Sequence, residues 1–167
     1  RRDTPLSSRH PMHLFTLGQF RAEGATPESR VLPAGKPLAL LLFLALAPKR
    51  RASRSALMAL LWDEPDERKL SNNFRQALHQ LRKALPDAVQ AGAAGTETLE
   101  LNIAIGIDAL HFERAVAAGD LEAAWAQYDG HFLADFAAAT EFDRWADGVR
   151  IRLREQWLRT GERIIED

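Results

Sequence analysis

The feature that most constrains this chain is the segment 68–85, whose two sides differ in character. Its apolar residues recur at spacings of 4, 4, 3 and 4: Leu70, Phe74, Leu78, Leu81 and Leu85. This periodicity predicts an amphipathic helix, which Pro86 ends because proline cannot continue a helix. No acidic residue lies within 68–85. We therefore expect one face to pack on a core and the opposite, polar face to be available to a partner.

The segments around this helix predict a small sheet, two further helices and a hairpin. A strand over 12–22, bent at its glycine, and a short strand at 31–32 are expected to form the sheet. Apolar residues and flanking prolines predict a helix over 38–47, buried on most sides. A second helix is expected over 54–62, with a serine as its N-cap. A hairpin over 88–101 follows the amphipathic helix.

The chain becomes helical towards its C-terminal end. Alternating isoleucines over 103–107 predict one more short strand. Helices are then expected over 111–117, 121–128 and 141–165, the first two separated by a glycine. Paired short helices resemble one unit of a helical repeat, which must pack on something because it cannot bury its own face.

The predicted fold class is α+β, with a border near residues 107 and 108. Residues 11–107 would form a winged helix-turn-helix domain, and residues 108–167 an all-α domain. The first range carries a net charge of +3 and the second of −6, and with the +2 of residues 1–10 the whole chain carries −1. This asymmetry indicates two units with different partners. Because no Pro/Gly-rich linker separates them, we expect a packed interface.

Composition excludes several classes of protein. The chain has no cysteine, which excludes disulfides, thiol nucleophiles and cysteine-ligated zinc and is typical of a cytoplasmic protein. The longest apolar run, Leu38–Ala47, is half of the roughly 20 residues that span a bilayer, so no membrane segment is expected. A signal peptide has an apolar stretch close behind its N-terminus, and this chain has none there, so no signal peptide is expected. The chain begins with Arg and not with Met, which is expected of a fragment of a longer protein.

Three helices followed by a hairpin are typical of a winged helix, whose recognition helix, here the last of the three, enters the major groove of DNA. The polar stripe of 68–85 has side chains suited to this: Asn and Gln can bind adenine, Arg can bind guanine, and Lys can neutralise phosphate. The candidate DNA-binding residues of the stripe are Arg68, Lys69, Asn72, Arg75, Gln76, His79, Arg82 and Lys83. Arg50, Arg51 and Arg54 join them at the start of the preceding helix. The simpler interpretation is a solvated charged face.

An acidic loop directly precedes the candidate recognition helix. It contains Asp63, Glu64, Asp66 and Glu67. Since DNA would repel these carboxylates, they are candidates for contact with a basic surface of RNA polymerase. The alternative is that they stabilise the positive N-terminus of the following helix.

Seven short segments of the chain together match the sequence pattern of a known family. The similar segments in the first part are 14–21 (LFTLGQFR), 35–41 (GKPLALL), 60–62 (LLW) and 72–82 (NNFRQALHQLR). Those in the second part are 107–113 (IDALHFE), 128–133 (YDGHFL) and 141–145 (EFDRW). In their order and spacing these segments resemble the Streptomyces antibiotic regulatory protein family, and the resemblance extends over residues 12–165.

The resemblance implies an OmpR-type winged helix followed by a bacterial transcriptional activator domain of tetratricopeptide-like helices. It implies a transcriptional regulator, usually an activator, that binds repeated promoter sites as a homodimer. The activator domain of the family normally continues well beyond three helices, so this one looks truncated. One departure concerns the wing loop 91–98, which has no Lys or Arg and contains Glu97. Minor-groove contact by this wing is therefore not expected.

Other functions have less support in the sequence. The five histidines lack cysteine partners, so no metal site is expected, and no nucleophile or phosphate-loop motif indicates an enzyme or a cofactor. The four tryptophans are expected to pack rather than to stack on single-stranded nucleic acid. The alternative to a DNA-binding regulator is a protein-interaction module whose winged helix no longer binds DNA.

Overall fold

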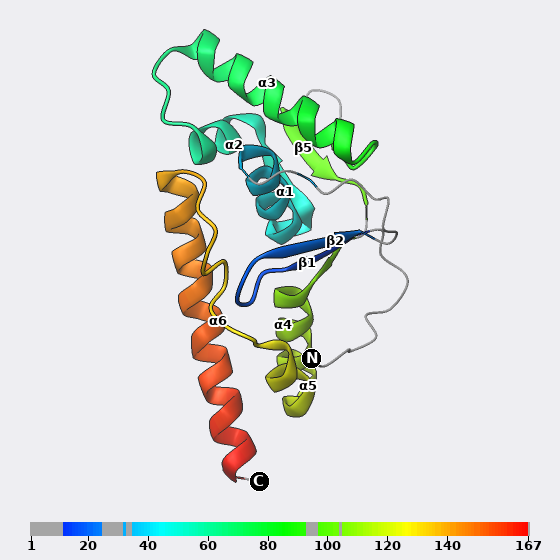
Figure 1. Cartoon of the computed structure of the whole chain (residues 1–167), viewed down its shortest axis with the longest axis vertical. Helices are drawn as coiled ribbons and strands as arrows, with labels where there is room; N and C mark the ends of the chain where they lie inside the picture. Colours follow the sequence, from blue (N-terminus) through cyan, green and yellow to red (C-terminus); the bar gives the residue numbers. More distant parts are fainter. Residues whose placement is uncertain (1–11, 25–31, 33–34, 93–96, 104, 167) are drawn as a thin grey trace.

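The computed structural model of the chain describes residues 12–24, 32, 35–92, 97–103 and 105–166. Two small sheets and six α-helices form an elongated molecule, with α3 at one end and the C-terminal part of α6 at the other (Figure 1). In the first part the elements are β1 (Met12–Phe15), β2 (Arg21–Gly24), α1 (Lys36–Leu46), the 3-10 turn η1 (Pro48–Arg50), β3 (Arg51–Ser53), α2 (Arg54–Leu61), α3 (Glu67–Ala84), β4 (Val89–Ala91), β5 (Thr98–Leu101) and β6 (Gly106–Ile107). They are followed by α4 (Asp108–Ala118), α5 (Leu121–Gln127) and α6 (Thr140–Glu166).

Helix α1 is the centre of the core. Every residue from Pro37 to Leu42 is buried, as the almost continuous apolar run predicted. Helices α2 and α3 pack on it, α2 through Leu57 and Leu61 and α3 through its apolar face. The predicted cap of α2 is confirmed: the Ser53 hydroxyl oxygen accepts a hydrogen bond from the Ala56 N–H at 3.1 Å.

The strands form two separate three-stranded sheets. In the first, of order β2-β1-β6, β1 pairs antiparallel with β2 and parallel with β6. In the second, of order β3-β5-β4, both neighbours of β5 run antiparallel to it. The predicted hairpin over 88–101 is thus confirmed as β4 and β5. The three helices and this sheet are consistent with a winged helix.

The N-terminal sheet differs from the predicted one. The segment 12–22 is not a single strand, because it turns back on itself to form the hairpin β1–β2. Gly18 lies in that turn with φ of 105°, a conformation that glycine adopts without steric cost. The second strand expected at 31–32 is absent at Leu32, which is buried outside any strand, and residue 31 lies outside the described part. The alternating isoleucines give only the two-residue strand β6.

The last three helices agree with the prediction to within a few residues. Helix α4 begins at Asp108, three residues earlier than predicted, because the chain enters it directly from β6. Gly119 ends α4 in the left-handed conformation, with φ of 75°. Trp157 of α6 lies between Trp125 and Tyr128 of the α5 region, with ring centroids at 4.9 Å and 4.8 Å. Most of the tryptophan surface is therefore used in packing, as expected, although Trp125 is 44% exposed.

The two parts of the chain are packed against each other. Helix α6 lies along α2 as well as α5, and Figure 1 shows it running along one side of the molecule. The Phe43 ring of α1 contacts the Trp145 ring of α6, with centroids at 5.1 Å. The Lys36 ammonium donates to the Ala138 carbonyl at 2.6 Å. Burial lowers the pKa of Lys36, against the opposing effect of Asp143.

The carboxyl group of Asp108 forms the most connected polar contact between the parts. Oδ1 accepts hydrogen bonds from the Thr16 N–H at 2.8 Å, the Thr16 hydroxyl at 2.6 Å and the Ala109 N–H at 2.8 Å. Oδ2 accepts from the Leu17 N–H at 2.9 Å. Asp108 is 7% exposed and Thr16 is fully buried. Burial raises the pKa of the Asp108 carboxyl, and these four hydrogen bonds oppose that rise.

Candidate nucleic-acid interface

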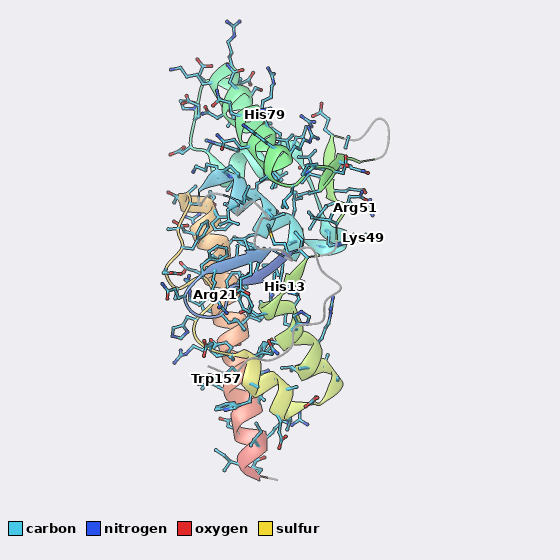
Figure 2. The ribbon with its side chains drawn as sticks, turned by 45° about the vertical axis from the view of Figure 1, so that its right-hand side comes forward. His13, Arg21, Lys49, Arg51, His79 and Trp157 are labelled. Atoms are coloured by element: carbon cyan, nitrogen blue, oxygen red, sulfur yellow. The ribbon has the colours of Figure 1, made fainter. Side chains whose placement is uncertain are left out.

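Helix α3 presents a polar face at one end of the molecule. Phe74, Ala77, Leu78 and Leu81 are buried, which fixes the rotation of the helix about its axis. All the residues of the predicted stripe are exposed: Arg68, Lys69, Asn72, Arg75, Gln76, His79, Arg82 and Lys83. Figure 2 shows His79 on this helix, at the opposite end of the molecule from Trp157. The stripe is therefore open to a large partner along its length.

Local contacts hold α3 in place at both ends. The Asp66 carboxylate caps its N-terminus by accepting hydrogen bonds from the backbone N–H groups of Arg68 and Lys69 at 2.9 Å and 3.1 Å. Near its C-terminus, the Arg82 side chain donates from Nε to the Val89 carbonyl of β4 at 3.4 Å. Arg82 thus links α3 to the hairpin. Among the described residues, its side chain is the one in the stripe that is seen to hydrogen-bond to another element.

The three candidate arginines around the start of α2 do not form one free basic patch. Arg50 donates from its guanidinium to the Ile103 carbonyl at 3.0 Å. Arg51 is paired with Glu100 at 3.5 Å across the β3–β5 ladder. The Arg54 guanidinium lies 5.8 Å from the centre of the Phe74 ring, and Arg54 is half-buried. Each therefore has a partner within the described part of the chain, where no hydrogen bond or ion pair is seen for most side chains of the α3 stripe.

The hairpin adds little positive charge to this end of the molecule. Glu97 is exposed, and its carbonyl accepts the Arg54 N–H at 2.8 Å. Glu100 neutralises Arg51 in the neighbouring strand. Residues 93–96 of the wing loop lie outside the described part. Within the described part of the hairpin, the charge favours α3 rather than the wing as the surface for a polyanion.

The acidic loop stabilises the N-terminus of α3, which is the alternative interpretation of its sequence given above. Asp66 caps α3, and the Glu64 carboxylate accepts a hydrogen bond from the Asp66 N–H at 3.1 Å. Asp63 and Glu67 are exposed. The loop can therefore stabilise the helix N-terminus and still present carboxylates to solvent.

We expect Asp66→Ala to lower the free energy of unfolding by about 1 kcal/mol, the usual cost of removing an N-cap. Asp63→Ala is the matched control, since it removes the same charge from the same loop without removing the cap. Urea denaturation of both variants measures the difference. Equal stability of the two variants would show that the Asp66 cap does not contribute.

Sequence reasoning missed two features of this region. The first is β3, whose pairing with β5 joins the segment before α2 to the hairpin. Its three residues are too few for an alternating pattern to be recognised. The second is the pair Lys49 and Arg50, which both have φ of 55°, an uncommon value for residues other than glycine. No local signal in the sequence indicates this conformation.

The described residues form neither a metal-binding cluster nor a membrane-spanning helix. They contain no group of three or more His, Asp or Glu side chains that could hold a metal ion. His10, one of the histidines considered for zinc, lies outside them. None of the helices that the structure describes has the length and apolar character needed to cross a membrane.

Comparison with known proteins gives a structural neighbour and no sequence relative. No protein-family model matches the chain, and no curated protein matches it by sequence. A solved structure of Mycobacterium tuberculosis EmbR, in complex with a low-affinity phosphopeptide, matches with a TM-score of 0.60 over 90% of this chain, at 20% sequence identity. This chain covers 44% of that EmbR chain. The likeness shows that the two share a fold.

Proposed function

We propose that the protein is a sequence-specific, double-stranded DNA-binding transcriptional regulator of the Streptomyces antibiotic regulatory protein type. The observation that carries this proposal is the exposed stripe of α3, which gathers amides, arginines and lysines on a helix whose opposite face is fixed in the core. The similarity of fold to EmbR supports it. Such a regulator acts by binding rather than by catalysis.

In this proposal α3 lies in the major groove. An α-helix with its side chains is about 10–12 Å wide, and the major groove of B-DNA is about 12 Å wide. Asn72 and Gln76 are one helical turn apart and can contact successive base edges, while Lys69 and Lys83 near the two ends can contact phosphates. Arg75 and His79 extend the same surface.

The proposal also assigns roles to the rest of the chain. Residues 11–107 are the DNA-binding domain, and residues 108–167 are the start of a bacterial transcriptional activator domain with tetratricopeptide-like helices. The exposed carboxylates of Asp63 and Glu67, with Glu64 and Asp66 beside them, would contact RNA polymerase. Binding of two copies to repeated promoter sites would give a homodimer on DNA.

We expect Asn72→Ala and Gln76→Ala each to relax base preference at one position of the site, by about 1–3 kcal/mol for a bidentate contact to adenine. Binding to unrelated duplexes should change little, because phosphate contacts remain. Gln127→Ala, at the end of α5, is a control of the same chemistry far from α3. Competition between the selected duplex and single-base variants measures the effect. Unchanged base preference in both α3 variants would contradict base reading by this face.

The function itself is tested by selecting random duplex DNA on the purified chain at about 50 and 200 mM salt. An enriched motif, in direct or inverted repeats, is the expected result. Retention without a motif would contradict sequence-specific binding by this chain. Absence of retention at both salt concentrations would favour a protein-interaction module. Two observations are in line with that alternative: Arg51 is paired with Glu100, and the wing loop 91–98 has no Lys or Arg.

A further inference from the structure

A cavity of about 270 Å³ lies where the two parts of the chain meet. Its walls come from the end of α1, η1, β5, β6 and α4. We propose that it binds a small organic anion, a carboxylate attached to an apolar chain or ring. This inference concerns a site away from the polar face of α3 and does not depend on DNA binding.

Among the described residues, two arginines and one histidine contribute the polar side chains that line the cavity. Arg50 comes from η1, and His111 and Arg114 come from successive turns of α4. None of the described residues that line the cavity is acidic. This is unusual for its surroundings, because residues 108–167 contain thirteen Asp and Glu against seven Arg. Two guanidinium groups, with no carboxylate among the described lining residues, favour an anion.

The remaining walls are aliphatic. Ala45, Leu101 and Leu110 line the cavity, together with Ile105 and Ile107. A purely inorganic anion would leave these surfaces without a partner, whereas an apolar chain would remove them from water. A few polar groups above an apolar floor are typical of small-molecule sites, and the volume is slightly below the usual range of roughly 300–1,000 Å³. The chemistry therefore fits a small amphipathic acid.

The backbone conformation at Arg50 also favours a ligand-binding site. Lys49 and Arg50 both have φ of 55°, a conformation that costs free energy for residues other than glycine and is found preferentially at ligand sites. It places Arg50 beside α4, and within the described part of the chain its guanidinium donates one hydrogen bond, to the Ile103 carbonyl at 3.0 Å. A guanidinium has five donors, so others remain for a carboxylate. Figure 2 shows the neighbours Lys49 and Arg51 on this side of the molecule.

The test uses octanoate as the probe, with isothermal titration calorimetry on the full chain. Octanoate should bind with one site per chain. 1-Octanol, which has no charged group, and inorganic phosphate, which has no apolar chain, should each bind at least roughly tenfold more weakly. Arg114→Gln should weaken octanoate binding by a similar factor. Arg159→Gln, an exposed arginine of α6 that does not line the cavity, is the matched control and should bind as the unchanged chain does.

Leu110→Trp provides a second variant, since the larger side chain should fill the cavity and abolish octanoate binding. Three results would overturn the proposal: no octanoate binding by the unchanged chain, equal binding by the Arg114→Gln and Arg159→Gln variants, or equal binding of phosphate and octanoate. Because DNA plays no part in the measurement, none of these results bears on the proposed regulator.

Discussion

Asp108→Ala is expected to lower the free energy of unfolding by about 3–5 kcal/mol. The Asp108 carboxyl accepts hydrogen bonds from three backbone N–H groups and one hydroxyl, and the variant leaves these buried donors without their acceptor. A buried donor that loses its partner costs about 1–3 kcal/mol, and some of these donors should regain water. The loss is therefore large for a single aspartate. Urea denaturation followed by circular dichroism measures it.

Two variants make this prediction specific. Asp129→Ala removes the same charge from an exposed position and should change stability by less than about 0.5 kcal/mol. Thr16→Val removes only the hydroxyl donor and should cost about 1 kcal/mol. If Asp108→Ala and Asp129→Ala unfold at the same urea concentration, the Asp108 hydrogen bonds do not hold the two parts together.

Asp108 also shows what the sequence could not predict. It was expected only as the first residue of a second domain, because its hydrogen-bond partners at Thr16 and Leu17 lie 92 and 91 positions away. The parallel pairing of β1 with β6 has the same origin: strands of four and two residues carry no pattern that identifies their partner. Contacts between distant segments depend on the whole fold, which no local pattern records.

The elements that sequence did predict are those with strong local signals. The bounds of α3 agree to within one residue, because its spacing of apolar residues extends over several turns and a proline follows it. The same periodicity correctly placed the stripe residues on the exposed face. It could not show that Arg51 pairs with Glu100 or that Arg50 contacts Ile103, since both interactions cross between elements. Arg50 and Arg51 are therefore less available to DNA than the sequence indicates, and the exposed cations of α3 are the better candidates.

The arrangement of the molecule bears on how α3 would be used. The helical part packs against α2 and α1 through α6, on a side of the core other than the one that α3 covers (Figure 1). The acidic excess of residues 108–167 is thus carried mainly by elements away from the polar face of α3. A polyanion that approached α3 would meet its lysines and arginines before these carboxylates.

The combined variant Lys69→Gln, Arg75→Gln and Lys83→Gln is expected to weaken DNA binding most. With Arg75 counted as a phosphate contact beside Lys69 and Lys83, the variant loses three such contacts. Each contributes a slope of about −0.9 to the dependence of log K on log salt concentration, so the magnitude of the slope should fall by about 2.7. At about 0.1 M salt this corresponds to a loss of affinity of roughly two to three orders of magnitude. Fluorescence anisotropy with one duplex, repeated at several salt concentrations, measures both quantities. Glutamine keeps the helix because its helix propensity is close to that of lysine and arginine.

The matched control is Arg154→Gln, Arg159→Gln and Arg163→Gln in α6. These three arginines are exposed, and their removal changes the net charge by the same amount at the far end of the molecule (Figure 1). If only the general charge of the protein attracted DNA, both triple variants would weaken binding alike. A reduced slope confined to the α3 variant would identify α3 as the surface that meets the phosphates. An unchanged slope in the α3 variant would contradict the proposed interface, because charge removed from a contacting surface must alter the number of counterions released.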